Sequence, residues 1–182
     1  MNSTEIYVLL SIVVNKGKYE TIREWGDRIG VGIAIINRSV KSLIKSKLVL
    51  ETPIKNKNSK SSSYVPFYSN VEKFLLNGFP FVFPAEKGKV VRGVLTGIDA
   101  SSLKSSFVDN EYPSVWPHHE GMVKGYQVDP LHKSIPGLVI EEKLEDDLYE
   151  MLALLDVLRT GKKREVDAAE KKLREIINNY AK

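Results

Sequence analysis

The chain has 182 residues, of which 42% are hydrophobic and 27% charged, a composition typical of a soluble globular protein with one large or two small domains. It has no cysteine, which excludes disulfides, thiolate metal sites and cysteine nucleophiles. The net charge is +4, but residues 1–68 carry 11 Lys and Arg against 5 Asp and Glu, so a polyanion is expected to bind this basic first third. With no basic leader and no long apolar run, we predict a cytoplasmic protein without a signal peptide or membrane span.

The first two predicted elements are amphipathic helices. Ile6, Leu9, Leu10 and Val13 have helical spacing over residues 4–15. The second helix opens with "TIRE", in which Thr21 and Glu24 have the spacing of a capping box, and Gly30 is expected to end it.

The third helix, "IAIINRSVKSLIKSK", is expected to carry the residues that contact a polyanion. Its apolar stripe points inward and consists of Ile36, Val40, Leu43 and Ile44. The opposite face holds Ala34, Arg38, Lys41 and Lys45, with Asn37 at its margin. Small residues beside long cations suit entry into a major groove and contact with phosphates.

A β-hairpin is predicted next, with strands "LVLETPI" and "SYVPFY" joined by a polar loop that carries Lys55, Lys57 and Lys60. The stretch "TIREWGDRIGVGIAIINRSVKSLIKSKLVLE", with this hairpin, resembles the winged helix-turn-helix of MarR-like bacterial regulators. The predicted DNA-binding residues are Asn37, Arg38, Lys41, Lys45, Lys55, Lys57 and Lys60. The alternative from the residues alone is a small helical domain whose third helix has a solvated basic face.

Ile33 and Ile35, near the start of the third helix, are unusually apolar for a DNA-reading helix. They either touch thymine methyl groups or pack on another part of the protein or on a partner. The second option makes the chain a protein-interaction adaptor or antitoxin-like module that uses the winged helix as a scaffold.

After a predicted connecting helix over 69–78, two segments match at a shift of 33 positions: "FPFVFPAEKGKVV" and "YPSVWPHHEGMVK". We predict two pseudo-repeats, at 79–93 and 112–125, each an extended segment bracketed by prolines, then a polar turn and a short strand. A basic residue and a glycine follow in each, Arg92-Gly93 and Lys124-Gly125. Arg92, Lys124 and Asp129 either line a pocket between the two units or are ordinary surface charges.

His118 and His119 fall in the predicted turn of the second repeat. Adjacent histidines on an extended chain point in opposite directions, so we expect a solvated turn and not a shared ion. A metal site would need His132 and a carboxylate such as Asp129 or Asp99. This leaves a metal-dependent sensor as a further alternative. No motif of a hydrolase or a nucleotide-binding loop occurs, so we predict neither an enzyme nor a cofactor.

Leucines and isoleucines at helical spacing predict a C-terminal αα-hairpin from "LEDDLYEMLALLDVLRT" and "KREVDAAEKKLREIINNY". It either packs on the middle of the chain or forms a homodimer interface. With "VFPAEKGKVVRGVLTG" and "VWPHHEGMVKG", this region resembles a family of bacterial winged-helix proteins. The resemblance implies a transcriptional regulator that is paired with a toxin or defence gene.

The combined prediction is an α+β chain. It has a winged helix-turn-helix at 1–68, a connecting helix at 69–78 and a regulatory or interaction domain at 79–182. The expected function is a sequence-specific regulator of transcription, a repressor or autoregulator. Its expected partners are double-stranded DNA, a possible second copy of the chain and a possible protein from a neighbouring gene.

Overall fold

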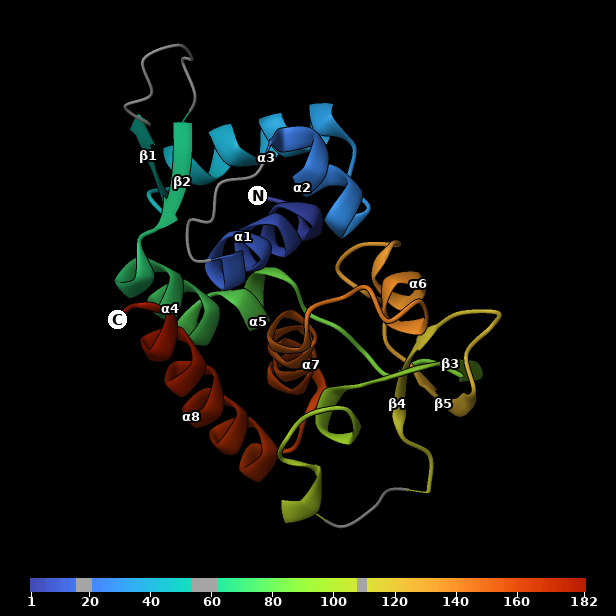
Figure 1. The fold of residues 1–182 in the computed structure, drawn as a ribbon. Coiled ribbons are helices and arrows are strands. Elements are labelled where there is room, and N and C mark those ends of the chain that lie inside the picture. Colours follow the sequence, from blue (N-terminus) through green and yellow to red (C-terminus); the bar gives the residue numbers. More distant parts are fainter. Residues whose placement is uncertain (16–20, 54–61, 108–110) are drawn as a thin grey trace.

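The computed structural model describes residues 1–15, 21–53, 62–107 and 111–182 (Figure 1). It is a mixed α and β structure with 57% helix, 15% strand and small sheets, in agreement with the predicted α+β class. Its first part consists of three helices, α1 (Ser3–Asn15), α2 (Ile22–Ile29) and α3 (Ile33–Lys45). The antiparallel strands β1 (Val49–Pro53) and β2 (Ser62–Pro66) follow.

Helix α1 is the centre of the molecule. It lies between α3 and α7 in Figure 1, and every residue from Glu5 to Val14 is buried. A helix that is apolar all round has neighbours on every side. The sequence indicated only one apolar stripe here, so the burial of the other faces comes from later parts of the chain.

Two short helices lead out of the hairpin, α4 (Tyr68–Asn77) and α5 (Phe79–Val82). The α5 segment is the start of the first predicted repeat, and it is a helical turn and not an extended segment. A proline in the first turn of a helix is tolerated, because the missing N–H has no partner there anyway. Burial of Phe79, whose ring lies 5.4 Å from that of Phe83, holds this turn in place.

Strands β3 (Val90–Thr96), β4 (Ser114–Pro117) and β5 (Val123–Gln127) form a small closed barrel. Strand β3 is antiparallel to both others, and β4 runs parallel to β5. The short 3₁₀ turns Gly97–Asp99 and Lys104–Ser106 lie between β3 and β4. A strand follows each of the two predicted turns, but the segments before the turns differ, helix α5 in one copy and strand β4 in the other. The predicted repeat of one structural unit is therefore not confirmed.

Glycines allow the three strands of the barrel to approach so closely. A Cβ atom on Gly93 would lie 2.1 Å from the Trp116 carbonyl oxygen, and one on Gly125 would lie 2.2 Å from that of Pro113. Both distances are far shorter than any tolerable contact, so no other residue fits at either position without moving a strand. These are the glycines of the two basic-Gly dipeptides.

The chain ends in α6 (Ile135–Ile140), α7 (Asp146–Thr160) and α8 (Lys163–Tyr180). Helices α7 and α8 pack against each other as the predicted hairpin. One cluster of buried hydrophobic side chains runs from Ile6 to Ile177 and crosses the predicted boundaries at residues 68 and 78. The first three helices thus share a core with α7 and α8.

Candidate nucleic-acid interface

The outer face of α3 carries the predicted DNA-binding side chains. Ile36, Val40 and Leu43 are buried, while Asn37, Arg38, Lys41 and Lys45 are all exposed. None of these four side chains forms an ion pair or a hydrogen bond with another described residue. The helix therefore presents three cations and an amide to solvent from a rigid backbone.

Local signals in the sequence set both ends of α2. The predicted capping box is present: the Glu24 N–H donates to Thr21 Oγ1 at 3.2 Å, and the Thr21 N–H donates to Glu24 Oε2 at 2.7 Å. The Thr21 N–H and the Thr21 hydroxyl, which donates to the same oxygen at 2.8 Å, hold the pKa of the Glu24 carboxyl below its usual range. At the other end Gly30 has φ of 66°, a left-handed conformation that ends the helix.

Apolar side chains accompany the cations. Ile33 and Ile35 are 48% and 41% exposed, so neither is covered by another described part of the chain. On the hairpin, Leu50 of β1 and Val65 of β2 are directly opposite each other and both exposed. Lys55, Lys57 and Lys60, which are predicted to contact DNA, lie outside the described residues.

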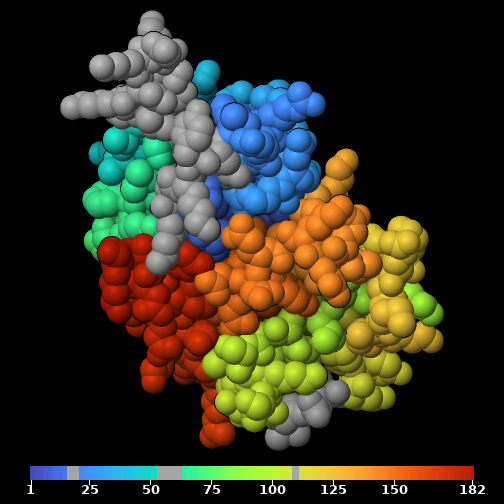
Figure 2. All heavy atoms as spheres, viewed as in Figure 1, coloured from blue at the N-terminus to red at the C-terminus, as the bar shows by residue number. Residues whose placement is uncertain are grey.

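The turn between α2 and α3 is in contact with the C-terminal half. The Ile29 carbonyl accepts from Tyr7 Oη at 3.1 Å and from Ser134 Oγ at 2.9 Å. Burial raises the pKa of Tyr7, so its hydroxyl stays a donor. The His132 ring stacks on Tyr7 at 5.8 Å, and its Nδ1 lies 2.7 Å from Ser134 Oγ. In Figure 2 the orange residues around 130–145 lie directly beneath the blue helices.

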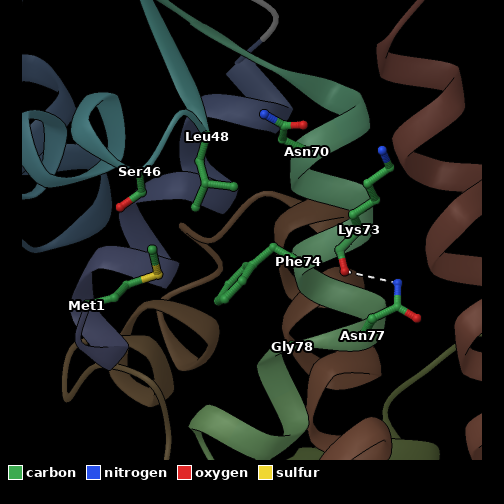
Figure 3. A pocket seen from close by; sticks show the side chains of 8 residues that line it. All are labelled: Met1, Ser46, Leu48, Asn70, Lys73, Phe74, Asn77 and Gly78. Atoms are coloured by element: carbon green, nitrogen blue, oxygen red, sulfur yellow. Dashed lines mark hydrogen bonds between the residues drawn. The ribbon is translucent and has the colours of Figure 1, made fainter.

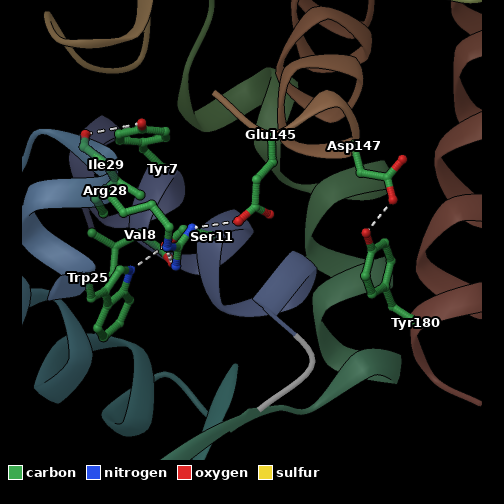
Figure 4. A network of polar contacts seen from close by, with 9 residues as sticks. All are labelled: Tyr7, Val8, Ser11, Trp25, Arg28, Ile29, Glu145, Asp147 and Tyr180. Atoms are coloured by element: carbon green, nitrogen blue, oxygen red, sulfur yellow. Dashed lines mark hydrogen bonds and ion pairs between the residues drawn. The ribbon is translucent and has the colours of Figure 1, made fainter. Parts of the chain in front are cut away.

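Figure 4 shows one further contact between the same two halves, together with contacts inside each half. Arg28 of α2 pairs with Glu145, the N-cap of α7, at 3.2 Å. Trp25 donates its indole N–H to Ser11 of α1 at 2.9 Å, and Tyr180 of α8 donates to Asp147 of α7. The orientation of α2 therefore depends on residues more than 100 positions away in the chain.

The histidines occupy the predicted turn, but one part of that prediction is wrong. The Gly121 N–H donates to the His118 carbonyl at 3.1 Å, which closes a turn over 118–121. Since the chain turns instead of staying extended, the rings of His118 and His119 lie only 4.6 Å apart. His132 lies elsewhere, on Tyr7. Among the described residues, no three His, Asp or Glu side chains are grouped to hold a metal ion.

A buried polar cluster on α7 was not predicted from the sequence. Asp156 is 1% exposed and accepts from Thr96 Oγ1 and Trp116 Nε1, both at 2.7 Å, and from Arg159. Burial raises the pKa of Asp156, against the lowering effect of Arg159 and the two donors. The Arg159 guanidinium also lies 5.7 Å from the centre of the Phe79 ring. A charge inside the apolar run "LALLDVLR" was the available signal for such a cluster.

An open pocket of about 450 Å³ lies between the start of α1, the end of α3 and α4 (Figure 3). Met1, Leu48 and Phe74 are its apolar walls, and Lys73 and Asn77 are among its polar ones. The Asn77 amide donates to the Lys73 carbonyl at 3.0 Å, so part of the polar lining is already paired. None of the predicted site residues lines this pocket.

No protein-family model, curated protein or solved structure matches the chain. Within the described residues, no helix is long and apolar enough to cross a bilayer.

Proposed function

We propose that the chain is a sequence-specific, double-stranded DNA-binding regulator of transcription, and that residues 1–68 act as a winged helix-turn-helix. The observation that carries this proposal is the outer face of α3, where Arg38, Lys41 and Lys45 are exposed and have no described acidic partner. A helix of this kind next to a two-stranded hairpin suits a major groove, with the hairpin beside the flanking phosphates.

The position of the turn before α3 supports the same reading. Gly30 ends α2 in a left-handed conformation and lets α3 leave at an angle, so that its outer face stays free of the core. The resemblance to MarR-like proteins adds the role of a repressor or autoregulator at a toxin or defence locus. Regulators of this kind commonly bind two half-sites as a homodimer.

The experiment is a selection of genomic DNA fragments by the purified chain, followed by fluorescence anisotropy on the selected site at several salt concentrations. We expect the Arg38→Ala, Lys41→Ala double variant to lose most of its affinity. Its plot of log K against log salt should be shallower by about 1.8, because each phosphate contact contributes about 0.9. A Lys104→Ala, Lys171→Ala variant removes two exposed charges elsewhere and is the matched control.

If the α3 variant binds the selected site as tightly as the wild type does, the proposal is wrong. Analytical ultracentrifugation tests the homodimer separately. A monomer at micromolar concentration, with and without the DNA site, would contradict it.

A second candidate function, a protein-interaction adaptor, is favoured by the exposure of Ile33 and Ile35 on the same helix. Two neighbouring isoleucines in solvent are typical of a surface that a protein partner covers. The discriminating variant is Ile33→Ser with Ile35→Ser. Loss of a stoichiometric protein partner, with DNA binding absent in the wild type even at low salt, would establish the adaptor.

A further inference from the structure

Three residues form one row across the small barrel. Arg92 on β3 is directly opposite Lys124 on β5. On its other side, the His118 N–H donates to the Arg92 carbonyl at 3.2 Å, one step beyond the pair Gly93–Pro117 of β3 and β4. Residues directly opposite each other in an antiparallel ladder project to the same face. The row is therefore Lys124 and Arg92, with the partly buried His118 at its end in backbone position. The His118 Nδ1 accepts from the Glu120 N–H at 3.2 Å, and the His119 ring lies beside the His118 ring.

This row is unfavourable for folding alone. Like charges directly opposite each other in a sheet destabilise it, and an acidic residue at either position would remove the repulsion. Arg92 and Lys124 are both exposed, and neither forms an ion pair or a side-chain hydrogen bond with a described residue. An anionic ligand placed between the two would relieve the repulsion.

The backbone under the row is held in one place. Gly93 and Gly125 directly follow the two cations, and each lies too close to a neighbouring carbonyl for any side chain. The strands cannot spread without losing this contact, so Arg92 and Lys124 are presented from a fixed frame. A binding group on a rigid element is more precisely placed than one on a loop.

Aromatic and apolar groups continue the same face. Val90 and Tyr126 are the next pair on that side, two residues along each strand. Tyr126 is partly exposed, and the Tyr112 ring meets it edge-on at 5.9 Å. Met122, two residues before Lys124, is 91% exposed. The cationic row thus lies beside a small aromatic and apolar platform.

We propose that this face binds single-stranded nucleic acid, with Arg92, Lys124 and His118 on the phosphodiester backbone and the Tyr126 ring against a base. Cations that follow the backbone next to aromatic rings that stack on bases are the features that bind single strands. An added peptide strand is disfavoured, because β3, β4 and β5 pair with one another in a closed barrel and leave no edge between them.

The face is distinct from the one proposed to bind duplex DNA. In Figure 1 the barrel lies at the lower right and α3 at the top, with α6 between them. This inference does not rest on the proposed function, and each of the two surfaces is tested by its own variant.

The experiment is fluorescence anisotropy at about 50 mM salt with labelled dT12 and U12 strands. We expect the wild type to bind both, and Arg92→Ser with Lys124→Ser to bind at least tenfold more weakly. The slope of log K against log salt should fall by about 1.4 in that variant, because each contact on a single strand contributes about 0.7. The Arg38→Ala, Lys41→Ala variant should bind the single strands as the wild type does.

Two further variants separate recognition from folding and from bulk charge. Tyr126→Phe keeps a ring and should keep the affinity, whereas Tyr126→Ser should lose about tenfold, the cost of one stacked base. Lys104→Ser with Lys171→Ser removes the same charge elsewhere and should change affinity little. Circular dichroism and thermal unfolding verify that each variant is folded.

The proposal is overturned if the wild type does not bind either strand at this salt, or if the Lys104, Lys171 control weakens binding as much as the barrel variant does. It is also overturned if polyglutamate displaces the strands at the same charge concentration. That result would assign the face to the carboxylates of an acidic protein segment instead.

Discussion

Trp116 on β4 donates its indole N–H to Asp156 on α7 at 2.7 Å, although the two residues are 40 positions apart in the chain. The bond ties the barrel to the helical core through a carboxylate that is almost completely buried. Thr96 of β3 and Arg159 of α7 complete the set of donors around the same carboxylate.

Substitution of Asp156 tests this link. In Asp156→Leu the Arg159 guanidinium stays buried without its carboxylate, and we expect a loss of about 3–5 kcal/mol in the free energy of unfolding. Asp156→Leu with Arg159→Met should recover a large part of that loss, because neither charge is then buried alone. Urea unfolding followed by tryptophan fluorescence measures both. With Arg159→Met measured alone, a double variant whose loss equals the sum of the losses in Asp156→Leu and Arg159→Met would show that the pair is not coupled.

The ring of His132 predicts how stability depends on pH. Burial, and to a lesser extent the charge of Lys133, lowers the pKa of His132 below its usual value. The unfolded chain therefore binds the proton more readily than the folded one does. The stabilising contribution of His132 is complete above about pH 6.5, the unfolded value, and is lost as the pH falls through the lower folded pKa.

The measurement is the free energy of unfolding at pH 8 and at pH 5.5 for the wild type and for His132→Phe. Phenylalanine keeps a ring on Tyr7 but cannot bind a proton. We expect the wild type to lose more stability between the two pH values than the variant does. Equal losses in the two proteins would show that His132 does not contribute to the pH dependence.

The close approach of the barrel strands predicts a large effect from a single methyl group. In Gly93→Ala the new Cβ would lie 2.1 Å from the Trp116 carbonyl oxygen, so β3 and β4 would have to separate. We expect the variant to lose several kcal/mol or not to fold. Gly32→Ala is the control, because a Cβ there meets no atom within 4 Å. Similar melting temperatures for the two variants would contradict the tight crossing.

The capping box at the start of α2 has a smaller predicted effect. Thr21→Ala removes the acceptor for the Glu24 N–H and should cost about 1 kcal/mol, whereas Thr21→Ser keeps the hydroxyl and should cost much less. Thermal unfolding compares the two variants. A loss shared equally by serine and alanine would point to the methyl group of Thr21 instead of the cap.

Local patterns were sufficient for the parts of this chain whose structure depends on near neighbours. The capping box at Thr21, the left-handed Gly30 and the two faces of α3 all follow from spacings of three or four residues, and the described structure has each of them. The pair α7–α8 was predictable in the same way, because each helix has its own apolar stripe and the two are joined by a tight turn at Gly161.

The candidate site on α3 was therefore predictable, whereas the row on the barrel was not. Arg92 and Lys124 stood out only as repeated basic-Gly dipeptides. Their alignment depends on the register between β3 and β5, and a shift of one residue would turn one of them to the other face. The two repeats also differ because of tertiary contacts. Phe79–Val82 is helical because Phe79 is buried in the core, whereas Ser114–Pro117 is a strand because it pairs with β3 and β5.

By itself the sequence determined helices α1 to α4, α7 and α8, the caps of α2 and the exposed charges of α3, since hydrogen bonds and side-chain directions within a helix repeat over a few residues. Only the tertiary structure decided what the buried and paired groups do. Asp156 needs donors from positions 96, 116 and 159, and the turn before α3 needs Ser134. Such contacts form only when distant segments share one core, because their energies depend on burial and register that no local spacing encodes.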